Sequence, residues 1–208
     1  MKYKKLTLGF LLIGAISMLI MSTPYFETAN AGILKYKILK DTPWYRMTFL
    51  IHILFGLFAI LSGPLQFMGS IIRRKPIHKT LGYIYTLGVF IASISGLVIA
   101  QFAMGGITTQ VGFSIMSLLW FSSLIIALQQ IYAGNIKAHK RWMTISYAIT
   151  FSAITQRSIL LLAFIPTVSF MPVYQLSSWL SWMINLTIVL VFMPAEASRP
   201  RINQLVKE

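Results

Sequence analysis

The chain contains no cysteine and only four acidic residues among its 208 positions. Without cysteine, disulfides, thiolate metal sites, Fe–S clusters and cysteine nucleophiles are excluded. The sequence contains no Gly-rich phosphate loop, Ser-His-Asp arrangement, metalloprotease spacing or paired carboxylates. It therefore lacks the side-chain arrangements that ordinary hydrolases use. The residues do not decide whether the chain catalyses a reaction at all.

Polar surface is also scarce, because charged residues make up 11% of the chain and hydrophobic residues 57%. This composition cannot cover a water-soluble globule, and it offers more apolar sequence than one core can bury. A net charge of +14 would suggest nucleic acid in a soluble protein. Here the basic residues lie in short segments between apolar runs. We therefore expect the partners to be the lipid bilayer and the anionic lipid headgroups at its cytoplasmic turns, and no nucleic acid.

Long apolar runs predict an all-α, polytopic transmembrane helix bundle with six spans and with the N-terminus and C-terminus in the cytoplasm. Lysine and arginine gather in the segments that this arrangement places in the cytoplasm, as the positive-inside rule requires. The predicted parts are a first transmembrane helix at residues 1–22, an external loop at 23–46, a four-helix core bundle at 47–164, a last outer loop and sixth transmembrane helix at 165–198, and a cytoplasmic tail at 199–208.

The first apolar run has two interpretations. Lysines precede residues 6–21, which indicates a retained helix that enters from the cytoplasm. The alternative is a signal peptide, because Ala29-Asn30-Ala31 has the small-x-small form of a cleavage site. We favour the retained helix, since the apolar core is long and the polar stretch before that site is unusually extended.

Small and polar residues fall on one side of several predicted spans at the helical period of 3.6 residues. On the second span they are His52, Gly56, Ala59, Gly63 and Gln66. Polar groups in lipid need partners and small residues let helices approach, so these stripes predict a shared interior. At about 1.5 Å of rise per residue, His52 and Gln66 are about 21 Å apart along one helix. The interior therefore divides into an outer and an inner layer.

The predicted outer layer holds His52, Gln156 and Arg157, with Asn185 as a further candidate. A guanidinium inside a span costs at least roughly 2.5 kcal/mol, and no acid lies in a predicted span to neutralise Arg157. Arg157 either snorkels outward to backbone carbonyls or holds an anionic group such as a propionate, a carboxylate or a quinone oxygen. His52 is either an ordinary interior histidine or, with Arg157 and Gln156, a site that binds a quinone head or relays a proton.

The predicted inner layer holds Gln66, His78, Gln129, Gln130, His139 and Arg141. His78 and His139 lie beside lysines at the cytoplasmic edge, where interfacial residues contact headgroups. The alternative is that both imidazoles ligate one haem b, with Arg141 or Lys79 near its propionates. Three histidines cannot supply two bis-histidine haems, and beyond this haem iron we expect no metal.

Several short motifs lie together between about residue 46 and residue 164. They are His52 with Gly56, Gly63-Pro64-Leu65-Gln66-Phe67, Arg73-Arg74, His78-Lys79 with Gly82 and Tyr85, Gly105-Gly106, Phe113, Trp120, His139 with Arg141-Trp142-Met143, and Arg157. This combination resembles the bacterial predicted membrane proteins grouped as domain of unknown function 2306. The resemblance implies a multi-pass protein of the bacterial cytoplasmic membrane without an established activity. Where this chain has Lys79, family members more often have arginine. A lysine cannot replace the planar guanidinium of arginine in a role that needs two parallel hydrogen bonds.

These observations leave several functions open. The interpretation we favour is a small haem- or quinone-associated redox membrane protein, because His78 and His139 have matched depth. The first alternative is a carrier or binding protein for a small anionic solute, with Arg157 and His52 as its outer gate. The second is an accessory subunit of a membrane complex with no site of its own.

Overall fold

The computed structural model describes residues 2–37 and 39–193, and every regular element in these ranges is a helix. Six helices are long and apolar enough to cross a membrane, which confirms the predicted all-α bundle. The predicted tail at 199–208 lies outside the described residues. The helices are α1 (Lys2–Ser22), α2 (Pro24–Glu27), η1 (Gly32–Tyr36), α3 (Pro43–Gln66), α4 (Gly69–Arg73), α5 (Lys75–Ala100), α6 (Ile107–Tyr132), α7 (Ile136–Leu160), η2 (Leu161–Phe164) and α8 (Phe170–Phe192).

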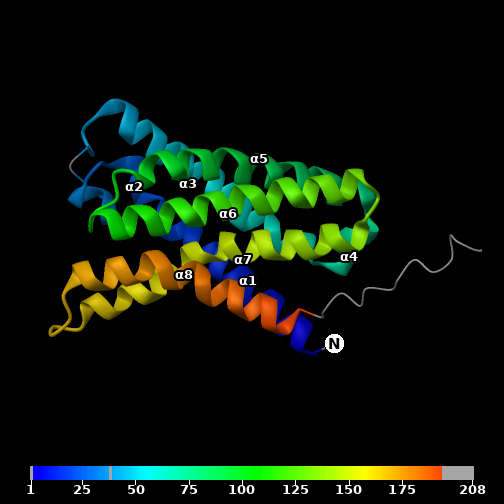
Figure 1. Cartoon of the computed structure of the whole chain (residues 1–208). Coiled ribbons are helices and arrows are strands. Elements are labelled where there is room, and N and C mark those ends of the chain that lie inside the picture. The colour runs from blue at the N-terminus through cyan, green and yellow to red at the C-terminus, as the bar shows by residue number, and fades with distance from the viewer. Residues whose placement is uncertain (1, 38, 194–208) are drawn as a thin grey trace, which may run out of the picture.

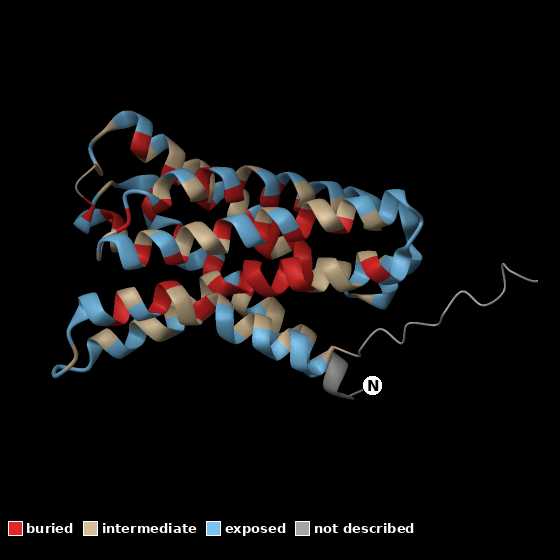
Figure 2. Cartoon of the chain, viewed as in Figure 1, coloured by how far each residue is buried: buried red, intermediate tan, exposed pale blue. Residues whose placement is uncertain are grey.

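The long helices run side by side, with α2 at one end of the bundle and α4 at the other (Figure 1). We call the α2 end the outer end and the α4 end the inner end, following the predicted orientation. Helix α3 packs most extensively on α5, α7 packs on α8, and α6 contacts both α5 and α7. Buried residues lie on the sides of the helices that face one another, and exposed residues lie on the perimeter (Figure 2).

Helix boundaries differ from the edges of the apolar runs. Helices α3 and α5 each have proline in the first turn, at Pro43 and Pro76, where its missing N–H leaves no helical bond unmade. The predicted external loop at 23–46 therefore contains α2, η1 and the start of α3. The basic residues predicted to form inner turns are mostly helical: Arg73 ends α4, and the others except Arg74 lie in the first two turns of α5 and α7. Asn135 caps α7, because its side-chain oxygen accepts a hydrogen bond from Ala138 N at 3.1 Å.

Glycine allows α3 and α5 to pack in backbone contact. A Cβ atom on Gly88 would lie 2.8 Å from the carbonyl oxygen of Phe55 and 2.9 Å from the nitrogen of Ala59. On the other side of α3, a Cβ atom on Gly63 would meet the ring of Tyr147. Ala59 and Gly63 of the predicted stripe are therefore positions at which α3 packs closely on its neighbours.

A buried hydroxyl network joins α5, α6 and α7 near the middle of the bundle. The Tyr85 hydroxyl lies 2.9 Å from Ser146 Oγ and 3.0 Å from Thr150 Oγ1. Trp120 donates from Nε1 to Thr150 Oγ1 at 2.9 Å. These side chains are buried, so each bond forms in surroundings of low dielectric constant, where a hydrogen bond is stronger than in water. The network holds the three helices together just inside the cavity described next.

Candidate functional site

A cavity of about 220 Å³ lies in the outer half of the bundle. All six spanning helices contribute side chains to it, and so do α2 and the segment around η1. At about 30 Å³ per water molecule, the cavity has room for about seven waters. It is therefore sized for a small ligand rather than a drug-sized one.

His52, Gln156 and Arg157, which we predicted to form the outer layer, all line this cavity. Asn185 does not line it. Its side-chain nitrogen donates to the Ala148 carbonyl at 3.1 Å, and its side-chain oxygen accepts from Thr155 Oγ1 at 3.0 Å. Asn185 thus ties α8 to α7 in place of contributing to the site.

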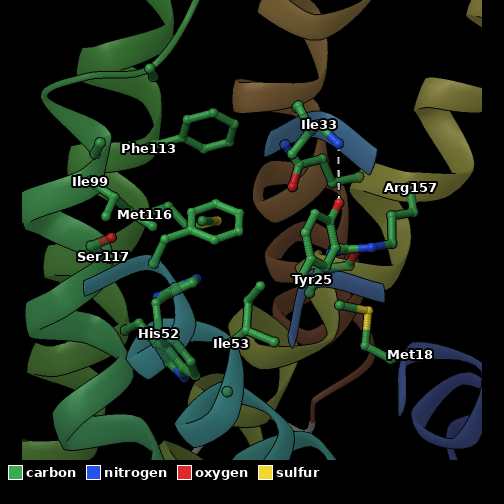
Figure 3. A pocket seen from close by; sticks show the side chains of 18 of the residues that line it. Met18, Tyr25, Ile33, His52, Ile53, Ile99, Phe113, Met116, Ser117 and Arg157 are labelled. Carbon is green, nitrogen blue, oxygen red and sulfur yellow. Dashed lines mark hydrogen bonds between the residues drawn. The ribbon is translucent and has the colours of Figure 1, made fainter. Parts of the chain in front are cut away.

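Arg157 lies in the last turn of α7, and its side chain extends toward Tyr25 (Figure 3). Its Nη1 donates to the Ala153 carbonyl at 2.9 Å. A guanidinium has five N–H donors, and no other acceptor for them is found in the described part of the chain. None of the described residues that line the cavity is an aspartate or a glutamate. A snorkelling arginine was expected to bond to a backbone carbonyl, as Arg157 does. Its other N–H groups have no acceptor among the described residues, and no described lining residue carries a negative charge to balance the guanidinium.

Lys37 is a second cation in the cavity that sequence reasoning missed. It is only 7% exposed, and its Nζ donates to the carbonyl of Phe102 at 3.3 Å. Burial lowers the pKa of the Lys37 ammonium to about 8. In the sequence it is one of several lysines in an external loop without helical period, so no signal there separates it from its exposed neighbours.

Tyr45 adds a hydroxyl with no acceptor or donor beside it. The side chain is fully buried and lines the cavity, and its oxygen has no hydrogen-bond partner within residues 2–37 and 39–193. A buried polar group without a partner costs roughly 1–3 kcal/mol. A bound ligand that accepts a hydrogen bond from Tyr45 would remove this cost.

His52 lies on the opposite side of the cavity from Arg157 (Figure 3). Its Nδ1 lies 2.8 Å from the Ala92 carbonyl oxygen, which can only accept, so Nδ1 is the donor. On a neutral ring, Nε2 is then the acceptor. The interior carbonyl bond predicted for an ordinary histidine is present, and one ring nitrogen remains for other contacts.

The inner residues are not brought to this cavity. Gln66 donates from Nε2 to the His78 carbonyl at 3.2 Å, and His139 donates from Nδ1 to the Ala127 carbonyl at 2.8 Å. The Nδ1 atom of His78 is buried without a partner among the described residues. Neither this cavity nor the one at the inner end has His78 or His139 in its wall. The haem site stays a prediction.

A second cavity, of about 480 Å³, lies at the inner end between the start of α7 and the end of α8. Its basic side consists of Lys137, Lys140 and Arg141. Its apolar side includes Phe192 and Met193. Arg141 therefore belongs to a surface of mixed basic and apolar character that is separate from the outer cavity.

Comparison with known proteins gives a family match. The family described as predicted membrane protein (DUF2306) matches residues 49–193. This range extends the resemblance seen in the motifs through α8, and it includes His52, Gln156 and Arg157 but not Tyr25, Lys37 or Tyr45. No curated protein and no solved structure matches the chain.

Proposed function

The chain belongs to the DUF2306 family of predicted membrane proteins, and we propose that it binds a small anionic solute in the outer cavity, as a binding protein or a carrier. That cavity lies within the bundle of six candidate spans. The single observation behind this proposal is Arg157, a cation that lines an interior cavity where no described lining residue is acidic. Lys37 adds a second positive charge to the same space.

The energetic argument rests on charge compensation. Removing a cation from water costs several kcal/mol unless an anion or several hydrogen bonds replace the lost hydration. The Ala153 carbonyl offers Arg157 only a partial charge. An anionic ligand would add charge-assisted hydrogen bonds, each of about 1.5–3 kcal/mol. Arg157 extends toward Tyr25 (Figure 3), and both residues line the cavity, which supports binding inside it.

Ligand-induced thermal stabilisation of the detergent-purified protein tests the proposal, with sodium butyrate and inorganic phosphate compared against equal sodium chloride. The Arg157→Gln variant should bind butyrate about 10- to 100-fold more weakly, which corresponds to one lost charge-assisted bond. Lys35→Met is the matched control, because Lys35 is an exposed cation close to Lys37 in the chain. Equal butyrate affinity in wild type and Arg157→Gln, with both folded, would contradict the proposal and leave Arg157 as a snorkelling residue.

A redox protein with haem b held by His78 and His139 is the second candidate. The observation that favours it is the buried Nδ1 of His78, which has no partner in the described ranges. A bound haem would supply one-electron transfer, and the two imidazoles would act as its axial ligands.

A quinone is the corresponding redox ligand for the outer cavity, where Arg157 and Tyr45 would donate hydrogen bonds to its oxygens. Binding of an uncharged quinone analogue without binding of butyrate would favour this interpretation.

The membrane setting extends the proposal to lipid. We propose that the protein lies in a bacterial cytoplasmic membrane and that anionic lipid headgroups bind at the inner end of its bundle. The cavity between α7 and α8 supports this, because its basic side suits a lipid phosphate and its apolar side suits an acyl chain.

An accessory subunit without a site of its own is the remaining hypothesis. It is favoured if substitutions of Arg157 and His139 change neither anion binding nor haem binding and a partner protein co-purifies.

A further inference from the structure

The residues that line the outer cavity extend along much of α3. Along α3 its lining runs from Tyr45 to Ile60. At about 1.5 Å of rise per residue this stretch spans about 22 Å, from the outer end of the helix to the middle of the bundle. The lining therefore has an outer part near Tyr45 and a deeper part near Ile60.

The polar groups that lack partners gather at the outer part of this cavity. The Tyr45 hydroxyl has no partner in the part of the chain that the structure describes. Within the described residues, Lys37 donates only to the Phe102 carbonyl and lies 6.0 Å from the centre of the Tyr174 ring. Arg157 donates there only to the Ala153 carbonyl. The outer part thus presents positive charge and a free hydroxyl to whatever enters.

The deeper part of the cavity is apolar. Ile53, Leu57 and Ile60 line it from α3, and Ile149 lines it from α7. Trp120 and Thr150 also line the cavity, and both are hydrogen-bonded within the protein. Trp120 donates to Thr150 Oγ1 at 2.9 Å, and Thr150 in turn donates to the Ser146 carbonyl at 3.0 Å. Neither side chain has a donor left for a ligand, so this region favours hydrocarbon.

We infer that the ligand is an amphipathic monocarboxylate whose carboxylate binds between Arg157 and Lys37 and whose chain extends along α3 toward Ile60. This inference rests on the proposed function, because it names the class of anion bound at the same site. The cavity volume of about 220 Å³ corresponds to about seven water-sized groups. If each carbon group takes roughly the volume of one water molecule, a carboxylate with a chain of about six to eight carbons fills the cavity.

The segment of residues 24–37 supplies the part of the site that recognises the charged end. Leu34 in this segment is fully buried, and Tyr25 accepts a hydrogen bond from Ile33 N at 3.3 Å. Gly32 has a positive φ of 43°, and a Cβ atom there would meet the Tyr25 ring. The segment is therefore packed against itself and the bundle, and it holds Lys37 over the cavity in a defined position.

Gly56 offers a way to block the apolar part without disturbing the fold. It lines the cavity, and a Cβ atom built on it meets no atom within 4 Å. In the Gly56→Leu variant the new side chain would occupy the space assigned to the hydrocarbon chain. Gly82→Leu is the matched control, because Gly82 also has open space at its Cβ position and does not line the cavity.

The test measures the binding of saturated monocarboxylates from acetate to dodecanoate to the full-length protein in one detergent. Wild-type affinity should rise about fourfold per methylene, which is the transfer free energy of a CH₂ group expressed as a binding ratio, and should level off near eight carbons. Each acid is compared between variants at the same free concentration, so partitioning into micelles cancels. Gly56→Leu should bind octanoate at least tenfold more weakly and butyrate within twofold of wild type, while Gly82→Leu matches wild type for both.

The outcomes separate the two proposals. If butyrate and phosphate bind in an Arg157-dependent way but affinity is independent of chain length and of Gly56→Leu, the amphipathic ligand is refuted and the anion site stands. If methyl octanoate binds as tightly as octanoate, the carboxylate contact with Arg157 and Lys37 is refuted. If no carboxylate and no phosphate binds to the folded wild type, the proposed function itself fails.

Discussion

Replacing Lys37 with methionine measures the cost of keeping a cation in the cavity. Methionine preserves most of the side-chain volume and removes the charge. Lys37 is 7% exposed, and burial lowers the pKa of its ammonium from 10.5 to about 8. The folded protein therefore holds this proton less tightly than the unfolded chain does, and the charged form is the one that folding disfavours.

The sign and size of the effect follow from this difference. Between about pH 8 and pH 10.5 the unfolded chain binds more protons, so the free energy of unfolding of wild type rises with pH. Burying the charge costs about 3 kcal/mol at pH 7 and about 2 kcal/mol at pH 9. Methionine removes that cost and also loses the bond to Phe102, worth about 1.5–3 kcal/mol. We expect Lys37→Met to be at least as stable as wild type at pH 7, and its advantage to shrink by about 1 kcal/mol at pH 9.

Thermal unfolding in detergent at pH 7 and pH 9 measures this change, which corresponds to about 2–4 °C in the difference between the two proteins. The other titratable groups that line the cavity, Tyr25, Tyr45, His52, Arg157 and Tyr174, are present in both proteins, so to first order their titration cancels in the difference.

The control is Lys35→Met, whose target is exposed with its Nζ 4.7 Å above the Tyr36 ring, and it should show no such pH dependence. A stability difference between Lys37→Met and wild type that stays constant or grows from pH 7 to pH 9 would refute the claim that Lys37 is charged and buried. Butyrate affinity adds a second readout. It should be lower in Lys37→Met than in wild type at pH 7, and the two should converge as pH rises through 8 and wild-type Lys37 loses its proton.

Three further predictions test the packing and the inner layer. Gly88→Ala should lower stability by about 1–3 kcal/mol, because its methyl group meets the backbone of α3, whereas Gly82→Ala, with open space, should be neutral or stabilising; equal thermal unfolding of the two variants would contradict this. Tyr85→Phe should lower stability by about 1–3 kcal/mol, since Ser146 and Thr150 lose a buried partner, and unchanged unfolding would show that the hydroxyl network is not stabilising. If haem b binds, purified wild type shows a Soret band that falls in His139→Ala, and a colourless preparation from haem-replete cells refutes the haem hypothesis.

The number and type of the spanning elements could be predicted from the sequence. In lipid, the backbone N–H and C=O groups of a spanning segment find no water to bond with. A single long apolar segment satisfies these groups internally by forming an α-helix. The helical period also predicted the inward side of α3 and α7, and His52 and Arg157 do line one cavity. The rise per residue separated Gln66 from that cavity, and its bond to the His78 carbonyl confirms the separation.

Other parts of the site could not be predicted in this way. Asn185 lies at a plausible depth, but it bonds to α7 and does not face the cavity. Tyr45 precedes the apolar run and looks like a headgroup-level aromatic beside Trp44, yet Trp44 is exposed and Tyr45 is fully buried. At a helix end the period extends over too few residues to assign a face.

What the sequence alone determined is the solvent of this protein, its helical spans, and the residues whose polarity forces them inward once lipid surrounds them. Only the tertiary structure decided which of those residues meet, and that Lys37 joins them. Residues 24–37 form short helices whose position depends on packing against distant parts of the chain, such as the Phe102 carbonyl that accepts from Lys37. A periodic pattern predicts the direction of a side chain within one helix, whereas contacts between irregular segments and the bundle arise only when the whole chain has packed.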